Sequence, residues 1–251
     1  MLLSLPRWGL TDIVPMPMRP LRLQKASCQY RTVILQHTFM IDAATIYSVM
    51  GYGTSLPDPQ TAAVVDELLP QALEAATPRY VSRIVEARQL GKTLILMDGV
   101  EFKVGGIIGS YLAGMTEACV FVATAGNEYD KWLQSIKARG DILYEYVADS
   151  IGSVIAEDNV DRLASELDRN AGMRHSLPYS PGYCAWDVAE QRKLFSILPE
   201  DRCGVALTES CLMHPVKSIS GFFALGEELV PQPYRCELCT NRNCFKNSAR
   251  R

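Results

Sequence analysis

Three cysteines near the end of the chain have the spacing of metal ligands. Cys236, Cys239 and Cys244 form the pattern C-x-x-C-x-x-x-x-C. Two thiolates separated by two residues can reach one metal ion from a tight turn, and four further residues bring back a third. The other five cysteines are scattered along the chain. The cluster therefore predicts a metal site.

The sequence leaves the fourth ligand and the metal open. Zinc needs a fourth ligand, as does an iron–sulfur cluster in full ligation. We take Cys211 as the first choice, and Cys184, His214, a partner chain or an open iron position are the alternatives. Redox use would explain why a cysteine tail is joined to a folded domain, so an iron–sulfur cluster is favoured. Zinc would instead staple the tail.

No catalytic residue is assigned. None of the three histidines lies in a nucleophile motif such as G-x-S-x-G, and no carboxylate pair stands out. Gly105, Gly106 and Gly109 follow a predicted strand and open a predicted helix, but the dinucleotide pattern G-x-G-x-x-G and a P-loop lysine are absent. Close packing of strand and helix explains these glycines better than a phosphate site.

The segment Pro178–Tyr183 predicts a rigid loop that could hold a ligand. Its two prolines fix φ while Gly182 frees it, so backbone amides and carbonyls stay available. Tyr179 and Tyr183 could supply stacking surfaces and hydroxyl groups, with Ser180 between them. The alternative is a rigid loop with no ligand.

Hydrophobic periodicity predicts the elements that position these residues. Helices are expected after the N-cap Asp58 (with a kink or break at Pro70), over 79–89, over 107–113, around 132–136, from the cap Asp141 to about 167, and after Asp187. Strands are expected over 93–97, 101–104 and 118–123, with 205–210 and 217–224 forming a hairpin around Met213-His214-Pro215. The order lacks a βαβ repeat, so the predicted fold class is α+β, or an irregular α/β fold.

Composition narrows the setting. The 251 residues carry a net charge of −3, which gives no general attraction to nucleic acid or anionic lipid. No apolar stretch approaches the ~20 residues of a membrane span, and the first ten residues lack a signal-peptide core. We expect a cytoplasmic protein with cysteines in a reducing compartment. Its predicted parts are an N-terminal extension (1–30), a main domain (31–230) and a basic, cysteine-rich tail (231–251).

Three motifs of the second half resemble the reactivation domain of cobalamin-dependent methionine synthase. They are Ser180-Pro181-Gly182-Tyr183, then Leu207-Thr208-Glu209-Ser210 with Met213 and Pro215, then Ser218-Ile219-Ser220-Gly221-Phe222. The resemblance implies a twisted antiparallel sheet with flanking helices. It also implies that S-adenosylmethionine binds in a shallow site at Tyr179, Ser180, Gly182 and Tyr183. That domain sits over oxidised cobalamin and supplies the methyl group when an electron donor reduces the cobalt.

The resemblance also implies a partner: a corrinoid protein or a cobalamin-dependent methionine synthase that carries the cobalamin. The chain would be an accessory protein rather than a complete enzyme. The family's loop arginine, which holds the ligand's carboxylate, falls on Pro178, and a glutamate that faces its amine falls on Ser153. Two alternatives are an iron–sulfur redox protein that no longer binds S-adenosylmethionine and a zinc-stapled interaction protein. Nucleic acid is an unfavoured partner because the basic tail lacks interleaved aromatic residues.

Overall fold

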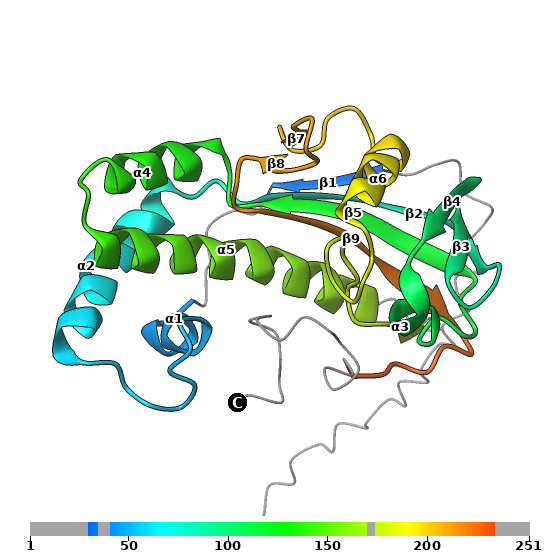
Figure 1. Cartoon of the computed structure of the whole chain (residues 1–251), viewed down its shortest axis with the longest axis horizontal. Helices are drawn as coiled ribbons and strands as arrows, with labels where there is room; N and C mark the ends of the chain where they lie inside the picture. Colours follow the sequence, from blue (N-terminus) through cyan, green and yellow to red (C-terminus); the bar gives the residue numbers. More distant parts are fainter. Residues whose placement is uncertain (1–29, 35–40, 170–173, 234–251) are drawn as a thin grey trace, which may run out of the picture.

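A computed structural model describes residues 30–34, 41–169 and 174–233 of the chain (Figure 1). The strands are β1 (Tyr30–Ile34), β2 (Arg79–Gln89), β3 (Leu94–Met97), β4 (Val100–Lys103), β5 (Glu117–Thr124), β6 (Arg174–His175), β7 (Ala206–Leu207), β8 (Met213–His214) and β9 (Ser218–Gly226). The helices are α1 (Ala43–Val49), α2 (Pro59–Ala75), α3 (Gly105–Gly109), α4 (Asn127–Lys137), α5 (Ile142–Asp168) and α6 (Gln191–Ile197), the last preceded by a 3-10 turn, η1 (Val188–Glu190).

One twisted antiparallel sheet forms the centre of the described structure. Its strand order is β4-β3-β2-β5-β9-β6, and β1 pairs with the first half of β2 on the edge that β3 uses further along. The register of β5 on β9 runs from Thr124 opposite Ser218 to Glu117 opposite Leu225. Alternate residues of β5 and β9 are buried on opposite faces, so the sheet is covered on both sides.

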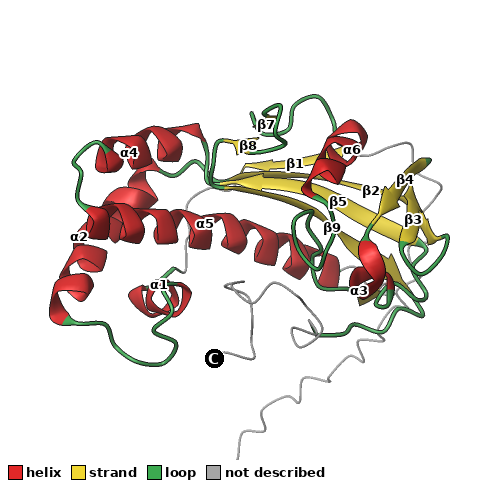
Figure 2. Ribbon diagram, viewed as in Figure 1, coloured by secondary structure: helices red, strands yellow, loops and turns green. Residues whose placement is uncertain are grey.

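The helix α5 joins two hydrophobic cores. At 27 residues it is about 40 Å long. Its second half packs on one face of the sheet, where Val160 and Leu163 meet Phe121 and Phe223. Its first half packs with α1, α2 and α4 in a separate helical cluster, which lies beyond one end of the sheet (Figure 2). The helix therefore fixes the helical cluster relative to the sheet.

Much of the predicted order of elements is confirmed. Asp58 caps α2, with its carboxylate accepting from the N–H groups of Gln60 and Thr61 at 3.0 Å, and Asp141 caps α5 in the same way. The helix α2 continues through Pro70 to Ala75, so no break occurs there. The turn Asp98-Gly99 joins β3 to β4 as expected. The α+β fold class with an antiparallel sheet is confirmed, and none of the described helices is both long and apolar enough to cross a membrane.

Two predicted elements are wrong. Residues 79–89 form the strand β2 rather than a helix. Tyr80 faces one side of the sheet, whereas Val81, Val85 and Ala87 face the other. Only Tyr80 to Ser82 are buried on both faces, whereas Ile84 to Arg88 alternate between exposed and buried, so this period of two was the better signal. The expected short helix over 107–113 is also displaced, since α3 ends at Gly109.

The expected hairpin of 205–210 with 217–224 does not form. The short strand β7 pairs instead with β8, inside the segment Met213-His214-Pro215 that was expected to be the turn. The strand β9 pairs with β5 on one side and β6 on the other, in the middle of the main sheet. Apolar residues on both faces of β9 allow either pairing, so the sequence alone did not set its partner.

The close packing predicted for Gly109 can be tested. A Cβ atom at this position would overlap the backbone carbonyl of Lys92, whereas a Cβ at Gly106 in the same helix meets nothing. We expect Gly109→Ala to lower the free energy of unfolding by about 1–3 kcal/mol, because backbone cannot yield as a flexible side chain can. The matched control Gly106→Ala should be neutral or stabilising by up to about 1 kcal/mol. Urea denaturation measures both, and equal stabilities of the two variants would contradict the packing.

Candidate functional site

The loop that carries the Ser-Pro-Gly-Tyr motif lies directly on β9. Tyr179 and Phe222 exchange two backbone hydrogen bonds, each 2.9 Å long. A Cβ atom on Gly221 would overlap the carbonyl oxygen of Tyr179 and lie 3.0 Å from the hydroxyl of Ser180. Only glycine therefore allows the loop to approach the strand this closely. This contact joins two of the three motifs on which the family resemblance depends.

Aromatic rings of the core pack against the buried side of the loop. The ring of Tyr179 stacks on Tyr111, with centroids 6.0 Å apart and planes 9° from parallel. Trp186, at the end of the loop, packs edge-on against Phe222 and Phe102 at 5.6 and 6.3 Å. Burial raises the pKa of the Tyr179 phenol, which stays protonated at neutral pH. Tyr179 is thus a core residue in the described structure, and its predicted stacking on a ligand stays a prediction.

The outer part of the loop faces the surface. Gly182 is exposed at φ +93°, and its N–H donates to the carbonyl of Trp186 at 2.7 Å. The N–H of Tyr183 donates to the carbonyl of Ser180 at 3.2 Å, which closes the turn. Ser180 and Tyr183 are half-buried. The structure brings these three predicted residues together at one rim, and their role in binding a ligand stays a prediction.

A buried lysine contacts Ser153, the residue on which the resemblance places the family's helical glutamate. Ser153 lies on α5, and its hydroxyl accepts a hydrogen bond from the Lys217 ammonium group at 3.0 Å. The same ammonium group forms an ion pair with Asp149, one turn earlier on α5, at 2.7 Å. The Lys217 side chain is only 10% exposed, and Gly152 makes room for it, since a Cβ there would lie 2.7 Å from its Cγ. This cluster was not predicted from the sequence, where its one signal was a lysine at the start of a largely apolar strand.

The described cysteines do not form a metal site. Within the described residues, Cys119, Cys184, Cys203 and Cys211 form no disulfide, and no three histidine, cysteine or acidic side chains gather as metal ligands do. Burial raises the pKa of Cys119 and of Cys203 to about 12, so both stay thiols at neutral pH. Cys211, the first choice for the fourth ligand, is buried between β7 and β8. The predicted ligands Cys236, Cys239 and Cys244 lie outside the described residues.

The alternative fourth ligands are separated in the described structure. Cys184 is half-buried with φ +51° and packs against the core on the face of the sheet that α6 covers. His214 is exposed on β8, with its Nδ1 atom 3.7 Å from the Asp130 carboxylate on α4. Neither belongs to a group of three described histidine, cysteine or acidic side chains that could hold a metal ion.

Comparison with solved structures identifies the class of fold. The chain matches the crystal structure of a MetH reactivation domain bound to AdoHcy with a TM-score of 0.54 and 16% sequence identity, over 82% of this chain and 80% of that chain. At this identity the likeness defines the fold. A search of curated proteins found no match.

A family model adds the sequence evidence. The model of the vitamin B12 dependent methionine synthase activation domain matches residues 107–230, which include the loop, α5 and β9. This part of the chain, just under half of its 251 residues, is similar to that family. The resemblance inferred from the three motifs is confirmed, as is the fold that it implied.

The contact between the loop and β9 makes a prediction for stability. Gly221→Ala should lower the free energy of unfolding by about 1–3 kcal/mol, because its methyl group overlaps the Tyr179 carbonyl. Hydrogen exchange should also speed up at the amides of Tyr179 and Phe222, which the displaced loop no longer protects. The neighbouring Ser220 is buried and its hydroxyl has no hydrogen-bond partner in the described structure, so Ser220→Ala should be neutral or slightly stabilising. Unchanged exchange in Gly221→Ala would contradict the contact.

Proposed function

We propose that the chain is a reactivation-type partner of a corrinoid protein or of a cobalamin-dependent methionine synthase, and that it assists the reductive reactivation of cobalamin. The observation that carries this proposal is the family match over residues 107–230, which spans the loop and the strand that holds it. The partner carries the cobalamin, and the contribution of the chain is to position the reacting groups. The absence of disulfides among the four described cysteines agrees with the reducing, cytoplasmic setting that we propose.

The rim formed by Ser180, Gly182 and Tyr183 is the proposed place for an adenosyl ligand. The related solved domain is bound to AdoHcy, which supports a ligand of this class. The charges differ from those expected for S-adenosylmethionine itself. Pro178 has no group that could pair with its carboxylate, and the ammonium group of Lys217 is bound to Ser153, on the helix that would face its amine. We therefore propose that S-adenosylmethionine binds weakly.

This weak binding can be tested by restoring the family's arginine. Pro178→Arg should raise the affinity for S-adenosylmethionine about tenfold or more, since a hydrogen bond to a charged group contributes roughly 1.5–3 kcal/mol. Pro178→Gln is the control, because it adds a donor without the charge. Isothermal titration calorimetry measures all three proteins. Equal affinities of Pro178→Arg and the unchanged protein would show that position 178 does not face the ligand's carboxylate.

For the tail, we propose an iron–sulfur cluster held by Cys236, Cys239 and Cys244. A cluster joined to this domain could pass one electron to the cobalt, so that cob(II)alamin becomes cob(I)alamin and can accept a methyl group. Zinc is the alternative, and it would only staple the tail. The basic residues of the tail favour docking on an acidic surface of the partner.

The cluster makes a direct prediction. Protein purified without oxygen should be brown and contain iron and sulfide, and Cys239→Ala should lose most of the visible absorbance because a thiolate ligand is gone. Cys28→Ser, a change outside the three-cysteine pattern, is the control and should keep the colour. A colourless protein with stoichiometric zinc would end the cluster proposal while leaving a metal in the tail.

Docking itself is tested with a methionine synthase that lacks its own activation domain. The full chain is crosslinked to this enzyme, loaded with cobalamin, in the cob(II)alamin and the methylcobalamin states. We expect the complex to form preferentially in the cob(II)alamin state, because this is the form of the cofactor on which reactivation acts. No complex in either state would overturn the proposed function.

The second candidate is a redox protein on the same fold, with a groove that accepts another ligand. The contacts of Lys217 with Asp149 and Ser153 favour this second candidate. They place the ammonium group of Lys217 where the amine of S-adenosylmethionine was expected. In this case the iron–sulfur cluster of the tail is the working centre, and S-adenosylmethionine does not bind to the unchanged protein or to Pro178→Arg.

A further inference from the structure

The outer edge of the strand β4 is covered by two side chains from a later part of the chain. In the described structure β4 stands at one end of the strand order, and β3 pairs with its inner edge. On the outer edge, the N–H of Lys103 donates to a carboxylate oxygen of Glu190 at 3.1 Å. The carbonyl oxygen of Glu101 accepts from the ammonium group of Lys193 at 3.0 Å. One backbone donor and one backbone acceptor of this edge are therefore occupied.

The two side chains are held in position as a pair. Glu190 ends η1 and Lys193 lies three residues later in α6, with its ammonium group 2.7 Å from the Glu190 carboxylate. The Glu190 side chain is only 12% exposed. The same ammonium group lies 5.9 Å from the centroid of the Phe102 ring, within the range of a cation–π contact. A carbonyl, a carboxylate and an aromatic ring thus fix one cation, which distinguishes this pair from a solvated surface ion pair.

An open strand edge is a template for another strand. Its unpaired N–H and C=O groups can bind a strand of a second molecule, and native proteins cover such edges for this reason. The carbonyl of Glu101 and the N–H of Lys103 are groups that a neighbouring antiparallel strand would bind. The side chains of Lys193 and Glu190 supply the donor and the acceptor that such a strand would bring.

The sequence of β4 is complementary to a second copy of itself. In an antiparallel pair centred on Phe102, Glu101 of one copy lies opposite Lys103 of the other, and the two-fold symmetry repeats this contact. Both side chains are exposed, on the face opposite to the buried Phe102. Opposite charges in directly opposed positions of two strands attract each other. The Glu101 carbonyl of one copy would then accept from the Lys103 N–H of the other.

We propose that the pair of Glu190 and Lys193 blocks the β4 edge and prevents two copies of this chain from joining their sheets there. The pair and a second copy compete for the same two backbone groups, the Glu101 carbonyl and the Lys103 N–H, so only one of them can bind at a time. This contact goes beyond the proposed function, since it holds whatever the loop and the tail bind.

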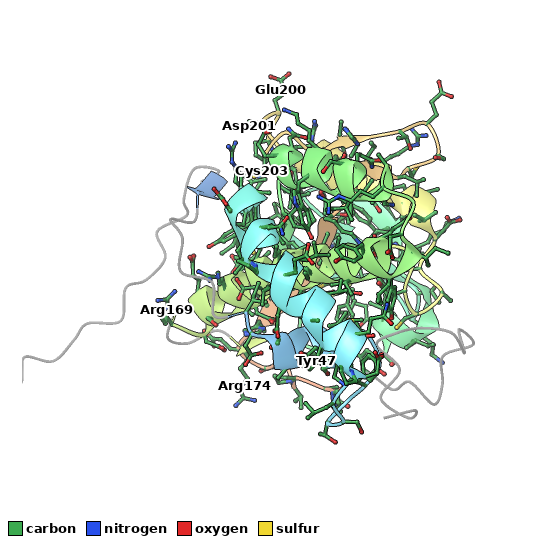
Figure 3. The ribbon with its side chains drawn as sticks, turned by 90° about the vertical axis from the view of Figure 1, so that its left-hand side faces the viewer. Tyr47, Arg169, Arg174, Glu200, Asp201 and Cys203 are labelled. Carbon is green, nitrogen blue, oxygen red and sulfur yellow. The ribbon has the colours of Figure 1, made fainter. Side chains whose placement is uncertain are left out.

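The test measures the mass of the full chain by sedimentation equilibrium over a range of concentrations. The double variant Glu190→Ala/Lys193→Ala removes both blocking groups, and we expect its mass to rise with concentration to twice that of the unchanged protein. The control Glu128→Ala/Lys131→Ala removes a 2.8 Å ion pair of the same spacing from α4 and should match the unchanged protein. The helix α4 belongs to the helical cluster, which faces the viewer in Figure 3 and lies at the other end of the molecule from β4 (Figure 1).

Two further variants show whether β4 is the interface. Added to the double variant, Lys103→Glu places like charges opposite each other and should abolish the dimer. Adding Glu101→Lys as well restores opposite charges and should restore the dimer. Lys193→Met alone is the mildest change, because it keeps an apolar side chain over Phe102 and frees only the Glu101 carbonyl. It should raise the mass in the same direction, and circular dichroism checks that each variant is folded.

Two results would overturn the proposal. The first is a folded double variant, or a folded Lys193→Met if the double variant does not fold, that keeps the mass of the unchanged protein at every concentration. The pair of Glu190 and Lys193 would then only hold α6 against β4. The second is a dimer that Lys103→Glu does not weaken, since the two copies would then join through another surface.

Discussion

The close approach of the loop Tyr179–Tyr183 to β9 is the constraint on which the rest of the site depends. Two backbone hydrogen bonds between Tyr179 and Phe222 hold the loop, and Gly221 leaves room for it. The stacking of Tyr179 on Tyr111 then buries the side of the loop that faces the core, so only its outer rim is left for a ligand. The position of that rim is set by the sheet, because β9 is one of its inner strands.

The helix α5 carries charged residues near both ends of β9. It spans both hydrophobic cores and carries Asp149 and Ser153, which fix the ammonium group of Lys217 at the start of β9. Its far end carries Asp168 beside His175. The pair of Asp149 with Lys217 thus lies at the start of β9, and the pair of Asp168 with His175 lies near its far end.

The motifs in the sequence were enough for the family and the fold class, since each motif is a local pattern that folds into a local contact. The caps Asp58 and Asp141 were read correctly for the same reason. The pairing of β9 was not, because it depends on residues a hundred positions earlier in β5. The strand β2 was taken for a helix although residues 84–88 alternate between exposed and buried, because its first half, buried on both faces, obscures that period. The role of Lys217 required the two acceptors on α5, which no spacing in the sequence brings next to it.

The central claim is that this chain helps to return oxidised cobalamin to its methylated state. It is tested most directly by mixing the full chain with a cobalamin-loaded methionine synthase that lacks its activation domain, in the presence of a reductant and S-adenosylmethionine, and following the absorption spectrum. The account predicts that the cob(II)alamin spectrum gives way to that of methylcobalamin faster with the chain than without it. An identical rate in the presence and absence of the chain would contradict the account.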